Sequence, residues 1–336
     1  PGSGKSFFAK REMANAFFAT NDHILILDPE NEYTALTEQL HGQTIYLAPD
    51  SHSYLNPMDL DLSTDVGESP MLMQVDFLLS QCELMMASYG NPLMPIEKSL
   101  IDRCISLVYR DYLKNPRPEN MPILGDLYQC LREQHNSRAD DLATAMEIYV
   151  TGSLSYLNHR TNVDLNNRMV CYNISKLGQG LKKLVMSNVQ KHIWQRTAVN
   201  RYAGITTRIF LDEFHLLLKE PQTAAYTAEI YKRFRKWNGI PTSLTQNVKD
   251  LLDSSEIENI LENSDFVLML NQGASDRNIL AQRLGISPQE LSHVTNSSEG
   301  EGLLFFGDKI IPFEDKFPRD TQLYRVMTTK PSDLAA

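Results

Sequence analysis

The sequence predicts an α/β fold, a mostly parallel and doubly wound sheet with an all-helical insertion. Short apolar strands alternate with helical segments early in the 336-residue chain and again in its second half, as in repeated βα units. The apolar run Ile24–Leu27 ends at Asp28 and Pro29, which is typical of a strand buried on both faces. Residues 66–162 have helical periodicity instead. The expected core is therefore 1–65 and 163–336, interrupted by a helical subdomain over 66–162.

The expected elements follow the chain in order. The strands of the core are bounded by turn residues or acids, and they are predicted at 24–27, 44–47, 169–174, 208–211, 240–245, 266–270, 302–306 and 310–313, the last two joined at Gly307-Asp308. Helices of the core are predicted at 7–20, 180–196, 223–237, 248–252, 256–262, 275–284 and 288–294. The helical subdomain is predicted to contain helices at 71–89, 96–113, 124–133 and 139–149, separated by breaker clusters.

Charge and cysteine content exclude several classes of protein. Lys and Arg total 32 against 42 Asp and Glu, a net charge of −10, which argues against a general nucleic-acid-coating surface. The longest apolar runs are too short to span a bilayer. The cysteines form no CxxC pair, so neither a zinc knuckle nor a disulfide framework is indicated, and a reducing cytosol fits best. They are Cys82, Cys104, Cys130 and Cys171.

The segment Gly2-Ser3-Gly4-Lys5-Ser6 matches the second half of the phosphate-binding motif G-x-x-x-x-G-K-[ST]. Small residues let backbone N–H groups curl around phosphate oxygens, so these five residues are predicted to bind ATP. Lys5 would reach the β- and γ-phosphates, and the Ser6 hydroxyl would coordinate Mg²⁺. The motif is already under way at Pro1, so we expect the chain to be a fragment of a longer protein. Alone, these letters would also fit a flexible turn.

Residues 208–215, RIFLDEFH, form a hydrophobic strand that ends in two adjacent acids, the Walker B pattern. Asp212 is predicted to hold Mg²⁺, usually through water, and Glu213 to polarise the attacking water as general base. A strand that ends in a solvated acidic turn would give the same letters. Together with the phosphate-binding motif on a parallel sheet, the pattern favours a nucleotide hydrolase.

Two further positions have two interpretations each. Gln246 follows the strand at 240–245, where a polar side chain can touch the γ-phosphate or the attacking water, although a turn residue would look the same. The segment KRFRKWNG places four cations within Lys232–Lys236 near a helix end. Cations there complement the helix dipole. Alternatively, one of them is an arginine finger that enters the ATP site of a neighbouring subunit.

These motifs, in this order, resemble the RecA-like motor domain of the conjugation and type IV secretion ATPases, the VirB-type or TraC-like branch of the HerA–FtsK superfamily. The NPMD and RKWNG…TQN elements point to this branch, because the phosphate-binding and Walker B motifs alone specify only a nucleotide hydrolase. The resemblance implies a RecA-like P-loop fold, and the block 66–162 resembles the insertion that these ATPases carry. The resemblance to this family covers nearly the whole chain. It rests on the segments PGSGKS, LDPENEY, LNPMD, FLDEFH, RKWNGIPTSLTQN and GEGLLFFGDKIIPF.

Carried over by position, the resemblance implies catalytic roles for Glu213, Gln246 and Arg235. Arg235 is favoured over Arg233 as the arginine that acts across a subunit interface. Glu32 matches the acid of the family's D-P-x-x-E element, but Asp28 and Glu32 would also serve to cap and orient the next helix. We expect the strand before the phosphate loop and an N-terminal channel-docking domain to precede this sequence in the longer protein.

The resemblance implies an ATPase that uses Mg²⁺ and energises a type IV secretion or conjugative DNA-transfer apparatus. It implies a homo-oligomer, a hexamer or other ring with composite sites, in contact with secretion-channel and coupling proteins. The expected location is the bacterial cytoplasm, peripheral to the membrane through those partners. Direct DNA contact is compatible with this role but is not required by it.

Two other functions stay open. A DNA-translocating motor of the coupling-protein or FtsK kind shares this core but needs a basic pore lining, and salt-dependent DNA binding with stimulated turnover would favour it. A nucleotide-gated assembly module would bind ATP without turnover, although the intact Glu213 speaks against it. The cations that would line a pore, unless they form a solvated helix face, are Lys182, Lys183, Lys191, Arg196 and Arg201.

Overall fold

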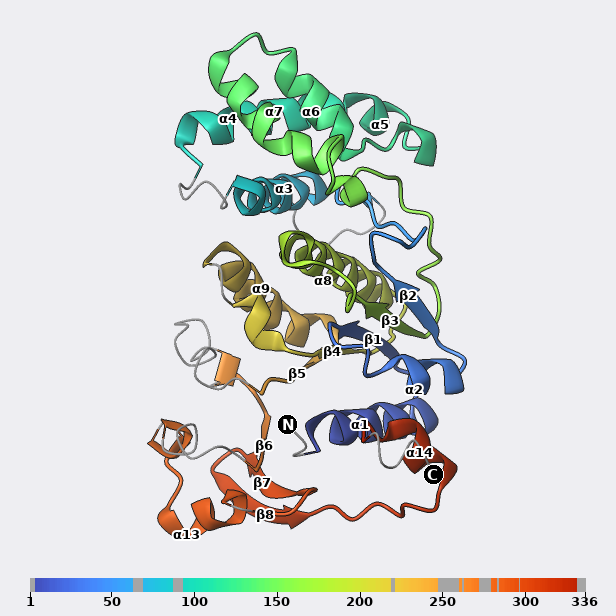
Figure 1. Ribbon diagram of the computed structural model, residues 1–336, viewed down its shortest axis with the longest axis vertical. Helices are drawn as coiled ribbons and strands as arrows, with labels where there is room; N and C mark the ends of the chain where they lie inside the picture. Colours follow the sequence, from blue (N-terminus) through green and yellow to red (C-terminus); the bar gives the residue numbers. More distant parts are fainter. Residues whose placement is uncertain are drawn as a thin grey trace. The chain divides into compact units, whose positions relative to one another are not determined.

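The structure is a computed structural model that describes residues 4–62, 69–86, 93–218, 221–246, 260–261, 263–271, 279–282, 284–295 and 297–330 (Figure 1). Within these ranges, the side chains of residues 221–223, 226 and 235 are not described. The chain divides into two compact units, which we treat one at a time. Unit 1 comprises Pro1–Thr44, Arg168–Cys171 and Ile205–Ala336, and unit 2 comprises Ile45–Asn167 and Tyr172–Gly204.

The main sheet has five strands in the order β2-β3-β1-β4-β5. β1 pairs in parallel with β4, and β4 with β5, so that Leu25 lies opposite Ile209 and Ile209 opposite Pro241. These parallel pairs are those of an α/β fold, as the sequence predicts. The strands are β1 (His23–Asp28), β2 (Gln43–Tyr46), β3 (Met169–Asn173), β4 (Thr207–Leu211) and β5 (Gly239–Ser243).

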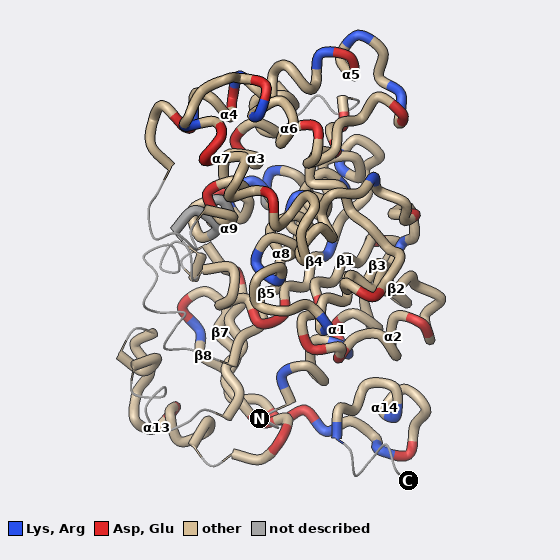
Figure 2. The backbone as a smooth tube through the Cα atoms, turned by 45° about the horizontal axis from the view of Figure 1, so that its top comes forward, with Lys and Arg blue, Asp and Glu red and all other residues tan. Residues whose placement is uncertain are grey.

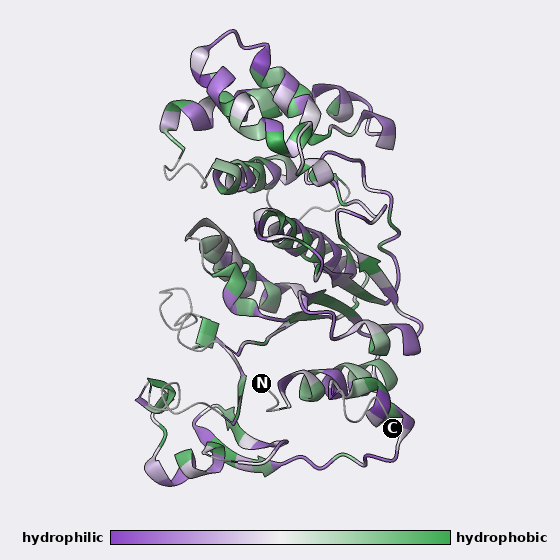
Figure 3. Cartoon of the chain, in the orientation of Figure 1, coloured by the Kyte–Doolittle hydropathy of each residue, from purple (hydrophilic) through white to green (hydrophobic). Residues whose placement is uncertain are grey.

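The apolar run of β1 is buried on both faces, which explains its lack of polar residues. Ile24, Ile26 and Phe210 share one face and belong to a core that includes residues of α1 (Lys5–Ala19). Leu25 points to the opposite face, because successive side chains of a strand alternate. Within unit 1, α1 and α9 lie on opposite sides of β4 and β5 (Figure 1), and the strands are largely hydrophobic (Figure 3).

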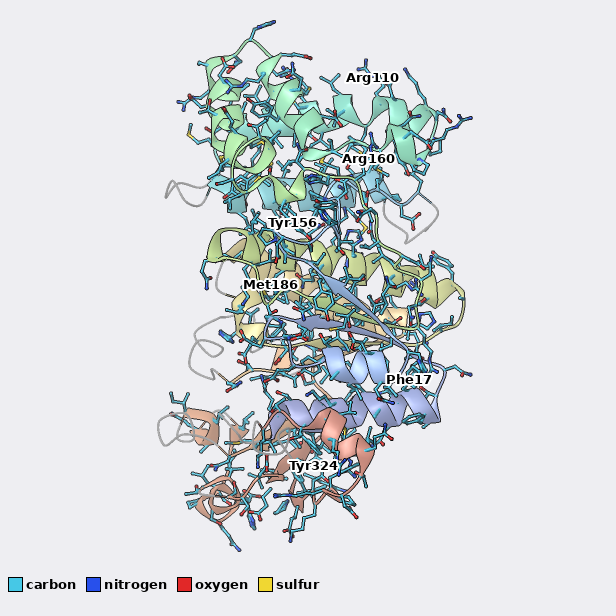
Figure 4. All side chains as sticks on the ribbon, turned by 45° about the vertical axis from the view of Figure 1, so that its right-hand side comes forward. Phe17, Arg110, Tyr156, Arg160, Met186 and Tyr324 are labelled. Carbon is cyan, nitrogen blue, oxygen red and sulfur yellow. The ribbon has the colours of Figure 1, made fainter. Side chains whose placement is uncertain are left out.

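The helix α1 packs against α14 (Gln322–Met327). The Nζ atom of Lys10 donates to the carbonyl of Met327 at 3.0 Å. The ring of Phe7 lies 5.4 Å from that of Tyr324, centroid to centroid. Tyr324 is labelled beside α14 in Figure 4. Further helices of unit 1 are α2 (Thr34–Gln39), η4 (Phe214–Leu217), α9 (Pro221–Phe234), η5 (Arg235–Trp237), α13 (Pro288–Leu291) and η6 (Ser292–Val294).

A second, three-stranded sheet of unit 1 is antiparallel and has the order β6-β7-β8. Its strands are β6 (Phe266–Leu270), β7 (Glu301–Phe306) and β8 (Lys309–Glu314). The predicted hairpin at Gly307-Asp308 is present, and Gly307 adopts the left-handed φ of 55° that the turn requires. The chain order suggested β6 as one more strand of the βα series, but its partner is β7.

Unit 2 consists mainly of helices around one polar-anchored segment. The segment Asn56–Asp59, which we call the NPMD segment, is bonded through its carbonyl groups to side chains of α3 and α8. The helices are α3 (Pro70–Met86), α4 (Pro95–Val108), α5 (Arg110–Lys114), η2 (Pro118–Asn120), α6 (Leu124–Arg132), α7 (Ser137–Val150), η3 (Ser155–Leu157) and α8 (Gln179–Tyr202).

Most differences from the predicted elements concern helix ends. The predicted helix at 96–113 divides into α4 and α5 at Tyr109, which is fully buried and donates its hydroxyl to the carbonyl of Met58. The helix predicted at 180–196 continues to Tyr202. The helix predicted at 248–252, most of the one at 256–262 and much of the one at 275–284 lie outside the described residues.

Candidate active site

Three neighbouring parallel strands bring the predicted polar residues to one edge of the sheet. β1 ends at Asp28, β4 is followed directly by Asp212 and Glu213, and β5 by a short segment that ends in Gln246. Because parallel strands share a direction, their carboxyl ends meet at the same edge, where α/β proteins bind ligands. Lys5, the first residue of α1, reaches the same place.

The backbone around Glu213 is fixed from both sides. The Asp212 N–H donates to the carbonyl of Leu27 at 3.2 Å, and the Phe214 N–H donates to the carbonyl of Leu244 at 2.9 Å. Between these two anchors Glu213 adopts a left-handed conformation, with φ 46° and ψ 45°. Such strain in a residue with a side chain persists only where the surroundings over-determine it, and it concentrates at functional sites.

Lys5 lies between the two acids. Its Nζ atom is 2.6 Å from Asp212 Oδ1 and 3.0 Å from Glu213 Oε1. Burial alone would lower the pKa of Lys5, but attraction and hydrogen bonds to Asp212 and Glu213 raise it above its ordinary value, so the ammonium form is favoured. An ammonium group has three donors, and one of them is left to meet a phosphate while both acids stay bound.

Gln246 completes the cluster. Its Nε2 atom donates to Glu213 Oε1 at 3.2 Å, so the structure places the glutamine against the predicted general base. An amide in this position can orient the carboxylate. Because it follows β5, it can also respond to whether the bound nucleotide has been hydrolysed. The four predicted residues Lys5, Asp212, Glu213 and Gln246 therefore form one connected site.

The donor set fits a magnesium ion. Asp212 is 1% exposed, and its Oδ2 atom is buried without a hydrogen-bond partner among the described residues. A buried oxygen of this kind is a hard ligand that suits Mg²⁺, directly or through water. Lys5, Asp212 and Glu213 together carry one net negative charge, which favours an added cation. Ser6, 8% exposed at the start of α1, is the second oxygen ligand that the sequence predicts.

Asp28 acts as the cap that the sequence offered as one of two interpretations. Its carboxylate accepts the backbone N–H groups of Glu30, Glu32 and Tyr33 at 3.2, 3.0 and 2.9 Å, just before α2. Burial raises the pKa of Glu32, and a hydrogen bond with Ser6 works against that rise. Glu32 therefore lies beside the predicted metal ligand and is more than an exposed cap residue.

Of the remaining predicted site residues, Gly4 is described, Gly2 and Ser3 are not, and Arg235 is described in its backbone alone. Gly4 has φ 92°, a left-handed conformation that explains a glycine before Lys5. Gly2 and Ser3 lie outside the described residues. The backbone of Arg235 begins η5, directly after α9, but its side chain lies outside the described part of the chain.

The family follows from a comparison with known protein families. The model of the TraG P-loop domain matches residues 1–300. The chain belongs to the TraG P-loop domain family. It is accordingly a P-loop ATPase with a RecA-like core, and this confirms the resemblance drawn from the motifs. No curated protein matches the sequence.

Solved structures share the fold of this TraG-family chain. VirB4 of Thermoanaerobacter pseudethanolicus matches with a TM-score of 0.85 and 24% identity, over 96% of this chain and 89% of that one. The plasmid coupling protein TrwB, solved with the ATP analogue ADPNP, matches with a TM-score of 0.60 and 13% identity, over 96% and 85%. TrwB solved with ADP and Mg²⁺ gives 0.58 and 12%, over 96% and 86%.

Two residues of the TraG-family site had no assigned role in the sequence. His215 Nδ1 lies 3.2 Å from Glu213 Oε2 and 3.2 Å from Thr245 Oγ1. His215 and Thr245 both lie within the motifs FLDEFH and TSLTQN, so their nearness in sequence to Glu213 and Gln246 was the one sign that they belong to the site.

Among the described helices of this protein, none has both the length and the apolar character needed to cross a bilayer.

Proposed function

We propose that this TraG-family domain hydrolyses ATP at the Lys5–Asp212–Glu213–Gln246 cluster and so energises a type IV secretion or conjugative DNA-transfer apparatus. The observation that carries the proposal is the contact of one lysine with both Walker B acids, at a strand edge that also presents Gln246 to Glu213. The family supports the motor function, and the TrwB complexes with ADPNP and with ADP and Mg²⁺ support the choice of ATP and Mg²⁺.

The chain's own residues divide the work between binding and hydrolysis. Lys5 would donate to the β- and γ-phosphates, together with the backbone N–H groups of the Gly2–Ser6 loop. Ser6 and Asp212 would hold Mg²⁺, whose charge would stabilise the charge that develops on the phosphate oxygens. Glu213 would orient the attacking water and accept its proton, while Gln246 fixes the Glu213 carboxylate.

The composite site is the second part of the proposal. Arg235 follows α9 directly, close in sequence to the basic residues at the end of that helix. We assign it as the residue that enters the ATP site of a neighbouring copy and stabilises charge on the transferring phosphoryl group. Hydrolysis then depends on a ring of copies, for which a hexamer is the proposed form.

The partners follow from the same role. The proposed ring contacts secretion-channel and coupling proteins, and these partners hold it at the cytoplasmic face of a bacterial membrane. The support is the TraG family and the similarity of fold to VirB4 and to the conjugative coupling protein TrwB.

Two of the five cations that could line a pore bind backbone groups instead, so the structure supports the pore-lining alternative less than the sequence does. Lys191 is 4% exposed and donates to the carbonyls of Pro57 and Asp59, and Arg196 donates to the carbonyl of Leu165 at 2.6 Å. Both cations therefore bind backbone groups of their own unit. Basic and acidic residues are interspersed along each unit (Figure 2). DNA contact thus stays outside the proposal.

Three variants of the full-length, assembled protein test the catalytic assignments. Glu213→Gln is expected to lower the steady-state ATP turnover by about 10²- to 10⁴-fold, since the general base is lost while the carboxamide keeps the volume. Arg235→Ala is expected to lower it by about 10³- to 10⁵-fold. Lys5→Ala should in addition weaken ATP binding, measured with a fluorescent nucleotide.

The controls separate assembly from chemistry. Each variant is checked for ring formation by light scattering, and exposed Lys236→Ala, next to Arg235, serves as the matched control that should keep its turnover. Full turnover in Glu213→Gln would contradict the scheme. Full turnover in an assembled Arg235→Ala ring would contradict only the composite site, and the roles of Lys5, Asp212 and Glu213 would stand.

A further inference from the structure

The two oxygens of the Glu213 carboxylate are held by different residues. Oε1 accepts from Lys5 Nζ at 3.0 Å and from Gln246 Nε2 at 3.2 Å, whereas Oε2 faces His215 Nδ1 at 3.2 Å. Lys5 and Gln246 belong to the assigned machinery, but His215 does not. The His215 side chain is 12% exposed and that of Glu213 is 11% exposed, so water competes little for this contact.

The proton on His215 can be placed by chemistry. A carboxylate oxygen only accepts hydrogen bonds, so Nδ1 must carry a hydrogen to make a favourable contact with Glu213 Oε2. The hydroxyl of Thr245, also 3.2 Å from Nδ1, adds a second polar neighbour from the segment after β5. The imidazole is thereby fixed between the residue that precedes η4 and the strand end that carries Gln246.

We propose that His215 is a positioning residue that holds the Glu213 carboxylate in the orientation required to activate water. The inference rests on the proposed role of Glu213 as general base. A carboxylate held at one oxygen can turn about its last side-chain bond, whereas one held at both oxygens cannot. Loss of the His215 donor therefore affects the hydrolytic step, and it leaves ATP binding through Lys5 and Ser6 intact.

Two substitutions separate the donor from the volume of the ring. His215→Leu keeps an apolar side chain of moderate size but removes the donor, and His215→Asn is smaller but keeps an N–H group near the position of Nδ1. We expect His215→Leu to lower kcat by about 10- to 100-fold with KM for ATP within about twofold of the parent. His215→Asn should recover most of the lost kcat. Exposed His293→Leu is the matched control and should leave kcat unchanged.

The outcomes distinguish this inference from the proposed function. The same assay includes Glu213→Gln and the double variant with His215→Leu. The double variant should have the same kcat as Glu213→Gln, because both residues act through one carboxylate. If Glu213→Gln abolishes turnover but His215→Leu keeps it, only the role of His215 is wrong. A loss in His215→Asn equal to that in His215→Leu would also overturn it. If His215→Leu does not fold, His215→Phe removes the same donor and keeps a planar ring, and an unchanged kcat there would refute the inference.

Discussion

At the scale of the residue, Asp28 shows how a buried carboxyl group beside the proposed active site serves the fold. The carboxylate is fully buried and uses both oxygens to bind three backbone N–H groups of the turn that leads into α2. Burial raises the pKa of Asp28, and these three hydrogen bonds oppose the rise. Asp28 thus fixes the position of Glu32, which lies next to Ser6.

The substitution Asp28→Ala is expected to lower the free energy of unfolding by about 2 to 3 kcal/mol, because three N–H groups lose their acceptor in a poorly hydrated turn. Urea denaturation of the full chain measures this loss. Glu30→Ala, at an exposed position of the same turn, is the control and should change stability by less than about 0.5 kcal/mol. Equal effects of the two substitutions would contradict the capping role.

The sequence could predict the Walker residues because their motifs encode backbone geometry as well as chemistry. Gly4 is a glycine because of its left-handed φ, and the acids after β4 must meet Lys5 at the carboxyl edge of a parallel sheet. His215 could not be assigned in the same way. Its contact with Glu213 depends on the 3₁₀ turn η4, and its contact with Thr245 joins two segments that no spacing rule relates.

At the scale of the element, the NPMD segment has a structural role, since its carbonyl groups join two helices of unit 2. Its carbonyl groups accept from long side chains on two helices, α3 and α8. Lys191 of α8 donates to Pro57 at 2.9 Å and to Asp59 at 2.6 Å, and Gln74 of α3 donates to Pro57 at 2.9 Å. Buried polar backbone must be paired, so these helices and the segment depend on one another.

Lys191 makes this element sensitive to pH. Burial lowers the pKa of Lys191 to about 7, whereas an unfolded lysine titrates at about 10.4. Between these values the unfolded state binds more protons, so the contribution of Lys191 to stability rises with pH, by at most about 1.4 kcal/mol per pH unit. Below about pH 7 both states are protonated and the contribution is constant.

We therefore expect the difference in unfolding free energy between the parent and Lys191→Met to shift in favour of the parent as pH rises from about 7 to about 10. Urea denaturation at several pH values gives this difference. Lys183→Met, at an exposed position of the same helix, should show no such shift. A difference between parent and Lys191→Met that stays constant with pH would contradict a buried, titrating amine.

The limits of prediction at this scale also have a physical cause. The apolar run of β6 predicts a strand, but it carries no information about its partner, and Phe266 pairs with Phe306 in an antiparallel sheet. The boundary between α4 and α5 at Tyr109 depends on a hydrogen bond to Met58, far away in the sequence. Local periodicity finds such elements, whereas long-range pairing decides where they end.

At the scale of the whole molecule, the proposed mechanism divides one active site between two copies of the chain. Lys5, Asp212, Glu213 and Gln246 are held together within one unit of a single copy. The backbone of Arg235 follows α9 in the same unit, and its side chain is proposed to act on the next copy. Turnover per chain should then rise with protein concentration until rings are complete, since an isolated copy lacks the arginine.

Mixing two inactive variants gives the sharpest test of this division. Glu213→Gln lacks the general base but still offers Arg235, and Arg235→Ala lacks the finger but keeps its own Glu213. In random mixed rings about a quarter of the sites combine an intact Glu213 with an intact Arg235 of the neighbour, so the mixture should regain activity that neither variant shows alone. Mixing Glu213→Gln with Lys5→Ala,Arg235→Ala is the control, because there no site is complete. A mixture of the first pair that forms rings but stays inactive would place Arg235 and Glu213 at the same site of one chain.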